Sequence, residues 1–246
     1  KRLERFVYNS SNAVTTIDKQ FYNIIKHRIK KESSLHIIPN FVDTDLYVTE
    51  SSTKLSAEFL SEPGFTNMLY AGNIGLAQEW DLVLNLAKEI RDEFITIWII
   101  GEGVKKEYLK SQIEKHQLSN IKLLPYQDRK YMPAINLFAD FHFIAMDKSM
   151  ENEGFPSKVY SIMASGRPMV IVSSENTPIT SFLNETDTSL LVTDHSLSGF
   201  KNAVLKLTSD KVLRNSLGAN GRKIIEQHYT KQIVVNQYID LVESLI

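Results

Sequence analysis

Short apolar runs separated by amphipathic segments are the feature that most limits what this chain can fold into. The runs are strand-sized and show no polar alternation, as in "ITIWII" over Ile95–Ile100. Strands that are buried on both faces read in this way, and they occur in parallel sheets with helices on each side. The pattern therefore predicts an α/β fold with a doubly wound parallel sheet.

The same pattern predicts where the elements lie. Strands are expected at Asn12–Ile17, Leu35–Ile38, Asn67–Ala71, Ile95–Ile100, Ile121–Leu124, Phe141–Ala145, Met169–Val172 and Ser189–Val192. A helix capped by Asp18 is expected after the first strand, and further helices at Ala77–Asp92, Lys105–His116, Lys130–Phe138, Ser157–Ala164, Pro178–Leu183, Leu197–Thr208, Lys211–His228 and Lys231–Leu245. The polar segment Tyr47–Phe65 is expected to be a linker with one short helix.

Composition excludes several classes of function. Lys and Arg number 28 against 29 Asp and Glu, so no overall field favours nucleic acid, and no nucleic-acid partner is expected. No apolar run approaches the ~20 residues of a membrane span. The absence of cysteine excludes disulfides and thiolate nucleophiles and fits a cytoplasmic location. The start "KRLERFVYNSSNAV" lacks an initiator Met and a signal-peptide core, so we expect a piece of a longer protein or one trimmed at its N-terminus.

Residues 1–31 carry a local excess of basic side chains, with eight Lys and Arg against Glu4 and Asp18. One interpretation is a solvated helix face. The other is attraction to an anionic acceptor or to anionic lipid, which would be a peripheral contact with the inner face of the membrane.

Ligands of doubly wound sheets bind at the carboxyl ends of the strands, so residues just after strands are the candidates. "GNIG" (Gly72–Gly75) and "GEG" (Gly101–Gly103) each join a strand to a helix. Such turns let a phosphate approach the backbone at a helix N-terminus, but a plain strand–helix turn reads the same way. Neither matches the dinucleotide or Walker spacing.

"MENEGFPSKVYSIMASGRP" (150–168) is the most specific stretch. Pro156 suits a first helical turn, and Gly166 suits the position after the helix. Lys158 in the first turn opposes the helix dipole, which a bound phosphate would offset. The alternative is a capping acid at Glu153 and a surface lysine.

Other patterns in the sequence give weaker evidence of function. Asp-x-Asp in "VDTD" (Val42–Asp45) is interpreted as a solvated turn. The six histidines show no metal-ligand spacing, so no metal site is predicted. His142 is interpreted as a core or partly exposed residue. No Gly-x-Ser-x-Gly elbow occurs.

Taken in order, "IIPNFVDTDLY", "LYAGNIGLAQEWDLVLNLA", "IWIIGEG", "MPAINLFADFHFIAM", "EGFPSKVYSIMASGRPMV" and "LGANGRKIIEQHYT" resemble the C-terminal half of family-4 glycosyltransferases. That family has a GT-B fold, in which two Rossmann-like domains face each other. The resemblance implies that residues 1–46 end an N-terminal acceptor domain and form a hinge. Residues 47–230 would then be the Rossmann-like donor domain, and 231–246 a helix that returns to the first domain.

The resemblance also assigns site residues. Glu153 matches the acid beside the donor sugar, which makes it the catalytic candidate. Residues that match the donor-binding positions are Gly72, Asn73, Tyr126, Gly154, Phe155, Pro156, Ser157, Lys158 and Ser161. Ser161 stands where the family has a second acid on the ribose. Asn73 and, approximately, Gln78 stand where many members have Arg and Lys on the diphosphate.

The implied function is retaining transfer of a hexose or N-acetylaminosugar from a nucleotide-diphosphate sugar to a glycan or lipid-linked acceptor in surface-polysaccharide biosynthesis. UDP is favoured over GDP, and no cofactor is expected. Two alternatives stay open: a non-catalytic GT-B-like partner subunit and a nucleotide-sugar epimerase of the same fold.

Overall fold

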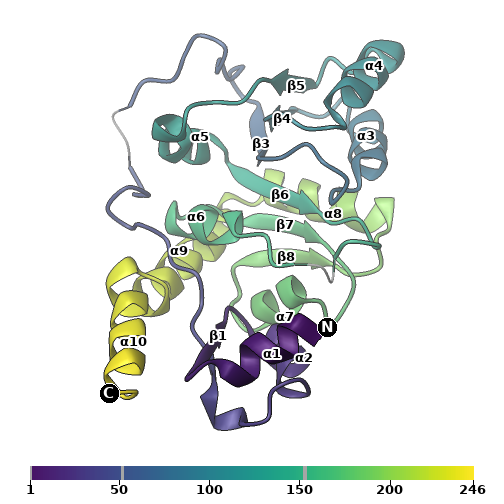
Figure 1. Cartoon of the computed structure of the whole chain (residues 1–246). Coiled ribbons are helices and arrows are strands. Elements are labelled where there is room, and N and C mark those ends of the chain that lie inside the picture. Colours follow the sequence, from purple (N-terminus) through teal and green to yellow (C-terminus); the bar gives the residue numbers. More distant parts are fainter. Residues whose placement is uncertain (1, 51–52, 152–153) are drawn as a thin grey trace.

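The computed structural model describes residues 2–50, 53–151 and 154–246, and it contains a parallel sheet of six strands (Figure 1). The strands are β3 (Thr66–Ala71), β4 (Ile95–Ile100), β5 (Ile121–Leu124), β6 (Phe141–Ala145), β7 (Met169–Val172) and β8 (Ser189–Val192). Their order in the sheet is β5-β4-β3-β6-β7-β8, and each neighbouring pair is parallel. The α/β fold with a doubly wound sheet is confirmed.

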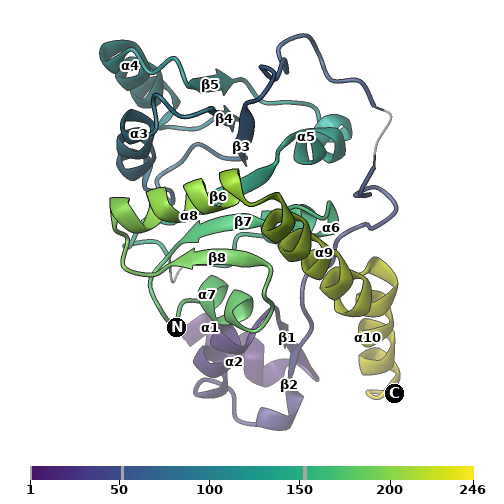
Figure 2. The same ribbon diagram turned by 180° about the vertical axis from the view of Figure 1, so that it is seen from behind.

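Helices cover both faces of the sheet because alternate residues of each buried strand point to opposite sides. Ile95, Ile97 and Ile99 pack into one core together with residues of α3 (Trp80–Glu89), α4 (Lys106–His116) and α8 (Leu197–Ser209). Trp98 and Ile100 pack into the opposite core against α5 (Met132–Phe138). On that second face, α6 (Lys158–Ala164) and α7 (Pro178–Asn184) cover the other half of the sheet. The two layers are seen from opposite sides in Figures 1 and 2.

The chain changes direction between β3 and β6. It first runs outward from β3 through β4 to β5, then returns to β6 and runs outward through β7 to β8. β3 and β6 are therefore neighbours whose following loops leave in opposite directions. This reversal is the switch point at which doubly wound sheets form a crevice for ligands.

The N-terminal residues form a separate small unit. It contains α1 (Arg2–Ser10), β1 (Val14–Thr16), α2 (Lys19–Lys26), a short 3₁₀ turn (Glu32–Ser34) and β2 (Leu35–Ile37), and β1 and β2 are parallel. Asp18 caps α2 through a 2.8 Å hydrogen bond from the Phe21 amide, as expected. The helix α1 was not predicted. At the other end of the chain, α9 (Lys211–His228) is followed by α10 (Lys231–Glu243), which shares a cavity lining with β2.

One predicted helix start and one predicted helix are wrong. The helix expected from Ala77 begins at Trp80, because Gln78 pairs with Met146 and the Glu79 amide donates to the Ala145 carbonyl. These contacts keep 77–79 extended beside β6. The predicted linker contains no helix within 47–50 and 53–65, the parts of it that are described.

Candidate functional site

Two glycine turns lock together at the carboxyl ends of β3 and β4. The Gly72 amide donates to the Ile100 carbonyl at 2.9 Å, and the Ile74 amide donates to the Glu102 carbonyl at 2.7 Å. Gly101 has a φ of +149°, and a Cβ on it would lie 1.9 Å from the Gly72 oxygen. No other residue fits there, so the backbone geometry at this edge of the sheet is fixed.

Two buried aromatic side chains form hydrogen bonds to backbone carbonyls of the turn at Gly72–Gly75. The Tyr70 hydroxyl donates to the Asn73 carbonyl at 2.6 Å, and the Trp80 indole donates to the Gly75 carbonyl at 2.9 Å. Burial raises the pKa of Tyr70 above its ordinary value, so its hydroxyl stays protonated. Gly72 and Asn73 remain exposed. The turn thus presents an ordered backbone to the crevice.

Lys158 lies beside this turn. Its Nζ is 3.6 Å from the centroid of the Tyr70 ring, and it is 2.9 Å from the place where a Cβ on Gly72 would be. An ammonium over an aromatic face gains electrostatic energy that partly offsets the loss of water. The residue is partly buried, and burial lowers its pKa to about 7. The predicted residues Gly72, Asn73 and Lys158 are therefore brought together at the switch point.

The start of α6 differs from the expectation. The helix begins at Lys158 with Ser157 as its N-cap, so Pro156 precedes the helix and does not lie in its first turn. The Ser157 side chain makes no capping hydrogen bond.

Three other predicted donor residues have distinct surroundings. Phe155 packs its ring against Tyr160 and Phe182, with both centroids 5.3 Å away. A side chain at Gly154 would meet no atom within 4 Å, so this position faces open space. The Ser161 hydroxyl donates to the Lys158 carbonyl at 2.9 Å, inside its own helix. Its lone pairs are its remaining means of binding a ligand hydroxyl.

Tyr126, another of the predicted donor-binding residues, follows β5. Its side chain is 68% exposed, and its amide donates to the Glu102 carboxylate at 3.5 Å. Glu102 also forms a hydrogen bond and ion pair with Lys106, which lowers the pKa of this carboxyl. The loop with Tyr126 therefore contacts the turn at Gly101–Gly103, and that turn is locked to Gly72. The catalytic candidate Glu153 lies outside the described residues.

One cluster near the site was not predicted. Glu151, two residues before Glu153, is 4% exposed, and it pairs with His195, which also pairs with Glu79. Glu79 and Glu151 lie 116 and 44 residues from His195. No local pattern reveals contacts over such separations, and an acid in a polar stretch reads as exposed. By contrast, His142 is a core residue as predicted, and burial lowers its pKa to about 3.

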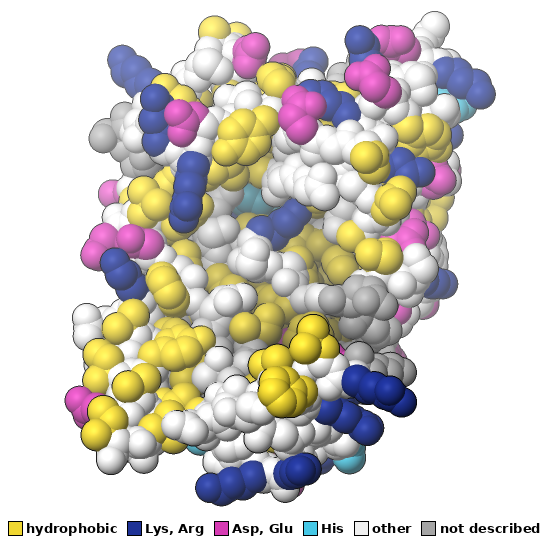
Figure 3. Space-filling view, viewed as in Figure 1, with side chains coloured by type: hydrophobic (Ala, Val, Ile, Leu, Met, Phe, Trp, Pro, Cys, Tyr) yellow, Lys and Arg dark blue, Asp and Glu magenta, His cyan; other side chains and the backbone are white. Residues whose placement is uncertain are grey.

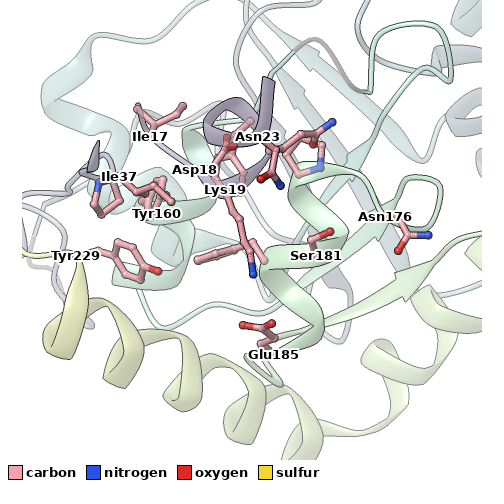
Figure 4. Close-up of a pocket in the computed structure, with 15 residues that line it drawn as sticks. Ile17, Asp18, Lys19, Asn23, Ile37, Tyr160, Asn176, Ser181, Glu185 and Tyr229 are labelled. Atoms are coloured by element: carbon pink, nitrogen blue, oxygen red, sulfur yellow. The ribbon is translucent and has the colours of Figure 1, made fainter. Parts of the chain in front are cut away.

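A cavity of about 510 Å³ is lined in part by Phe155 and Tyr160, and Tyr160 is labelled in the close-up of Figure 4. Its lining combines residues of the N-terminal unit, including Asp18 and Lys19, with Ser181 and Glu185 of α7. Gly72, Asn73 and Lys158 do not line it. In the space-filling view, the face is hollowed near its centre, and a basic side chain is visible in that hollow (Figure 3).

Neither a metal centre nor a membrane-spanning helix is found among the described residues. No group of three or more His, Cys, Asp or Glu in them could hold a metal ion. None of the helices they form is long and apolar enough to cross a membrane.

Comparison with known proteins assigns the chain to a family. Residues 51–224 match the family of glycosyl transferases group 1. The chain is 21% identical over 253 residues to the "Probable glycosyltransferase WbjE" of Pseudomonas aeruginosa, covering all of this chain and 61% of that protein. It is 23% identical over 167 residues to a poly(ribitol-phosphate) alpha-N-acetylglucosaminyltransferase of Staphylococcus aureus, covering 67% of this chain and 32% of that protein.

The fold is also found in solved structures. HepE from Anabaena, crystallised with UDP and glucose, superposes with a TM-score of 0.81 at 15% identity, over 99% of this chain and 66% of that one. The chain thus spans less than two thirds of the length of these relatives. The family match covers most of the chain and includes both glycine turns and α6. This chain therefore belongs to the glycosyl transferases group 1 family.

Proposed function

We propose that this chain is the donor-binding half of a retaining glycosyltransferase that takes its sugar from UDP. The observation that carries the proposal is the position of the Lys158 ammonium, 3.6 Å from the Tyr70 ring centroid and beside Gly72 at the switch point. A cation there would bind the diphosphate and stabilise the negative charge that develops when the sugar–phosphate bond breaks. Exposed Asn73 would contact the same phosphates.

The remaining roles follow the sequence resemblance. Glu153 would lie beside the sugar and stabilise the transition state, with Gly154, Phe155, Pro156 and Ser157 forming the adjoining loop. Ser161 would bind the ribose and Tyr126 the base. The donor-binding half would need no metal ion, because Lys158 would supply the positive charge that binds the diphosphate.

The sugar and acceptor classes come from the relatives. One relative is named as an N-acetylglucosaminyltransferase acting on poly(ribitol-phosphate), and HepE was crystallised with UDP and glucose. We therefore propose transfer of a hexose or N-acetylaminosugar to a glycan or lipid-linked acceptor in surface-polysaccharide biosynthesis. Basic side chains of the N-terminal unit, seen at the lower edge of Figure 3, would attract an anionic acceptor or lipid surface at the inner face of the membrane.

A thermal-shift panel of UDP- and GDP-sugars against the full-length protein tests the proposal. A ligand that binds the native state raises the melting temperature, so UDP-sugars should raise it more than GDP-sugars do. Ser161, whose hydroxyl donates within its own helix, favours the second candidate, a non-catalytic partner subunit. That candidate predicts no shift with any nucleotide sugar.

A further inference from the structure

The buried imidazole of His195 joins two carboxylates at the carboxyl edge of the sheet. Its Nδ1 lies 2.8 Å from Glu79 Oε2, and its Nε2 lies 3.1 Å from Glu151 Oε2. The side chains of His195 and Glu151 are only 2% and 6% exposed. Both ring nitrogens therefore lie within hydrogen-bond distance of a carboxylate oxygen, and the imidazole bridges the two acids.

Glu151 is held in its ionised form by several donors. The Ser174 amide donates to the same Oε2 at 2.9 Å, and the Ser173 hydroxyl at 3.4 Å. Burial alone would raise the pKa of the Glu151 carboxyl, but the hydrogen bonds from Ser174 and the charge of His195 lower it below its ordinary value. Glu151 is thus held in place by donors from the loop after β7 and by the imidazole of His195.

The cluster of Glu79, Glu151, Ser174 and His195 joins four loops. Glu79 follows β3, Glu151 follows β6, Ser174 follows β7 and His195 follows β8. These four strands are consecutive in the sheet. The cluster therefore spans the switch point and fixes Glu151, which leads directly into the segment that ends at Lys158.

The backbone at His195 is strained in a way that supports a specific role for its side chain. Its φ of +55° is in the left-handed region, which is costly for residues other than glycine. Such strain persists where surrounding contacts over-determine it, and it clusters at functional sites. Here the contacts are the two carboxylates.

We propose that His195 is a positioning residue for the transferase reaction: its imidazole bridges Glu79 and Glu151 and so fixes residues 147–151, which lead into the predicted donor loop. Without this imidazole, the carboxylates of Glu79 and Glu151 would face each other with no group between them. Their repulsion would displace the loop. The inference rests on the proposed function for its catalytic part only.

The test is His195→Asn in the full-length protein, because asparagine tolerates the left-handed backbone but its shorter side chain cannot bridge both acids. Two quantities are measured: hydrogen exchange of residues 147–151 and steady-state kinetics with a UDP-sugar. We expect exchange in this segment to quicken, and kcat to fall roughly 10- to 100-fold because the donor site is misplaced, with little change in KM for the acceptor. The matched control is Gln117→Asn, at another left-handed residue (φ +51°) that is exposed at the end of α4. It should change neither quantity.

A second variant separates charge from packing. His195→Asn combined with Glu151→Gln removes the repulsion, so the double variant should be less impaired than the two single effects predict. Unchanged hydrogen exchange in His195→Asn would show that His195 does not hold residues 147–151 in place. Faster exchange together with a wild-type kcat would show that His195 has no positioning role in the reaction. A wild-type protein that neither binds nor turns over any nucleotide sugar would defeat the proposed function, while the exchange measurement would still decide whether His195 holds the loop.

Discussion

The Lys158 ammonium lies 3.6 Å from the centroid of the Tyr70 ring, which is itself tied by its hydroxyl to the exposed turn at Asn73. Lys158 of α6 and Tyr70 of β3 are thus in contact at the switch point. The ring offers the ammonium partial compensation for lost water, but it offers no counter-charge. An anion that enters the crevice would supply that charge.

The first prediction is that binding of UDP takes up a proton. Burial lowers the pKa of Lys158 from 10.5 to about 7, so above pH 7 much of the free protein carries a neutral amine. A diphosphate favours the charged form and raises this pKa, so affinity should fall as pH rises from 7 towards 9. Calorimetry at pH 8 in buffers with different ionisation enthalpies measures the proton count.

Lys158→Arg is the control for this prediction, because arginine stays charged throughout this range. The variant should bind UDP without proton uptake. Equal proton counts in both proteins would show that Lys158 is not the group that titrates.

The second prediction concerns Glu153. Removing its charge in Glu153→Gln should lower kcat by roughly 10²- to 10³-fold, the range seen when one group that stabilises developing charge is lost. The KM for the donor should change little, since the effect falls on the transition state. Glu175→Gln removes an exposed acid from the loop after β7 and should keep wild-type rates. Equal turnover by Glu153→Gln and the wild type would remove Glu153 from the reaction.

The third prediction concerns the contact between α6 and α9. A Cβ on Gly218 would lie 2.1 Å from the Gly166 oxygen, so Gly218→Ala must separate the end of α6 from α9. We expect a loss of about 1–3 kcal/mol in the free energy of unfolding. It is measured by urea denaturation monitored by circular dichroism.

Gly221→Ala is its matched partner in the same helix. There the nearest atoms, all of Met163, would lie 3.4 Å from the new Cβ, which is ordinary contact. The helix gains up to about 1 kcal/mol from replacing glycine, so this variant should be neutral or slightly more stable. If both alanine variants were equally tolerated, close approach at Gly218 would not be what holds α9 against α6.

The strands of the sheet were predicted well because a strand that is buried on both faces appears in the sequence as a continuous apolar run. In β4 each residue from Ile95 to Ile100 is buried, and the predicted and observed bounds of this strand agree. The start of α3 was misplaced because its position depends on a contact across the sheet, the pairing of Gln78 with Met146. Apolar periodicity does not record such contacts.

The site was predicted less completely. Gly72, Asn73 and Lys158 were assigned to donor binding by the family resemblance, and the structure places them side by side. Tyr70 was missed, because a tyrosine inside an apolar run reads only as core. His195 was missed because its partners are distant in the chain, and its left-handed backbone leaves no pattern in the residues around it.

The most direct test of the central claim compares UDP with uridine. Lys158→Met removes the ammonium and keeps the length of the side chain. By calorimetry on the full-length protein near pH 7, the variant should bind UDP roughly 10- to 100-fold more weakly, the range expected for a lost hydrogen bond to a charged group. Its affinity for uridine should change less than about twofold, since uridine has no phosphate for the ammonium to bind. Equal weakening of both ligands, or of neither, would contradict the placement of Lys158 on the diphosphate.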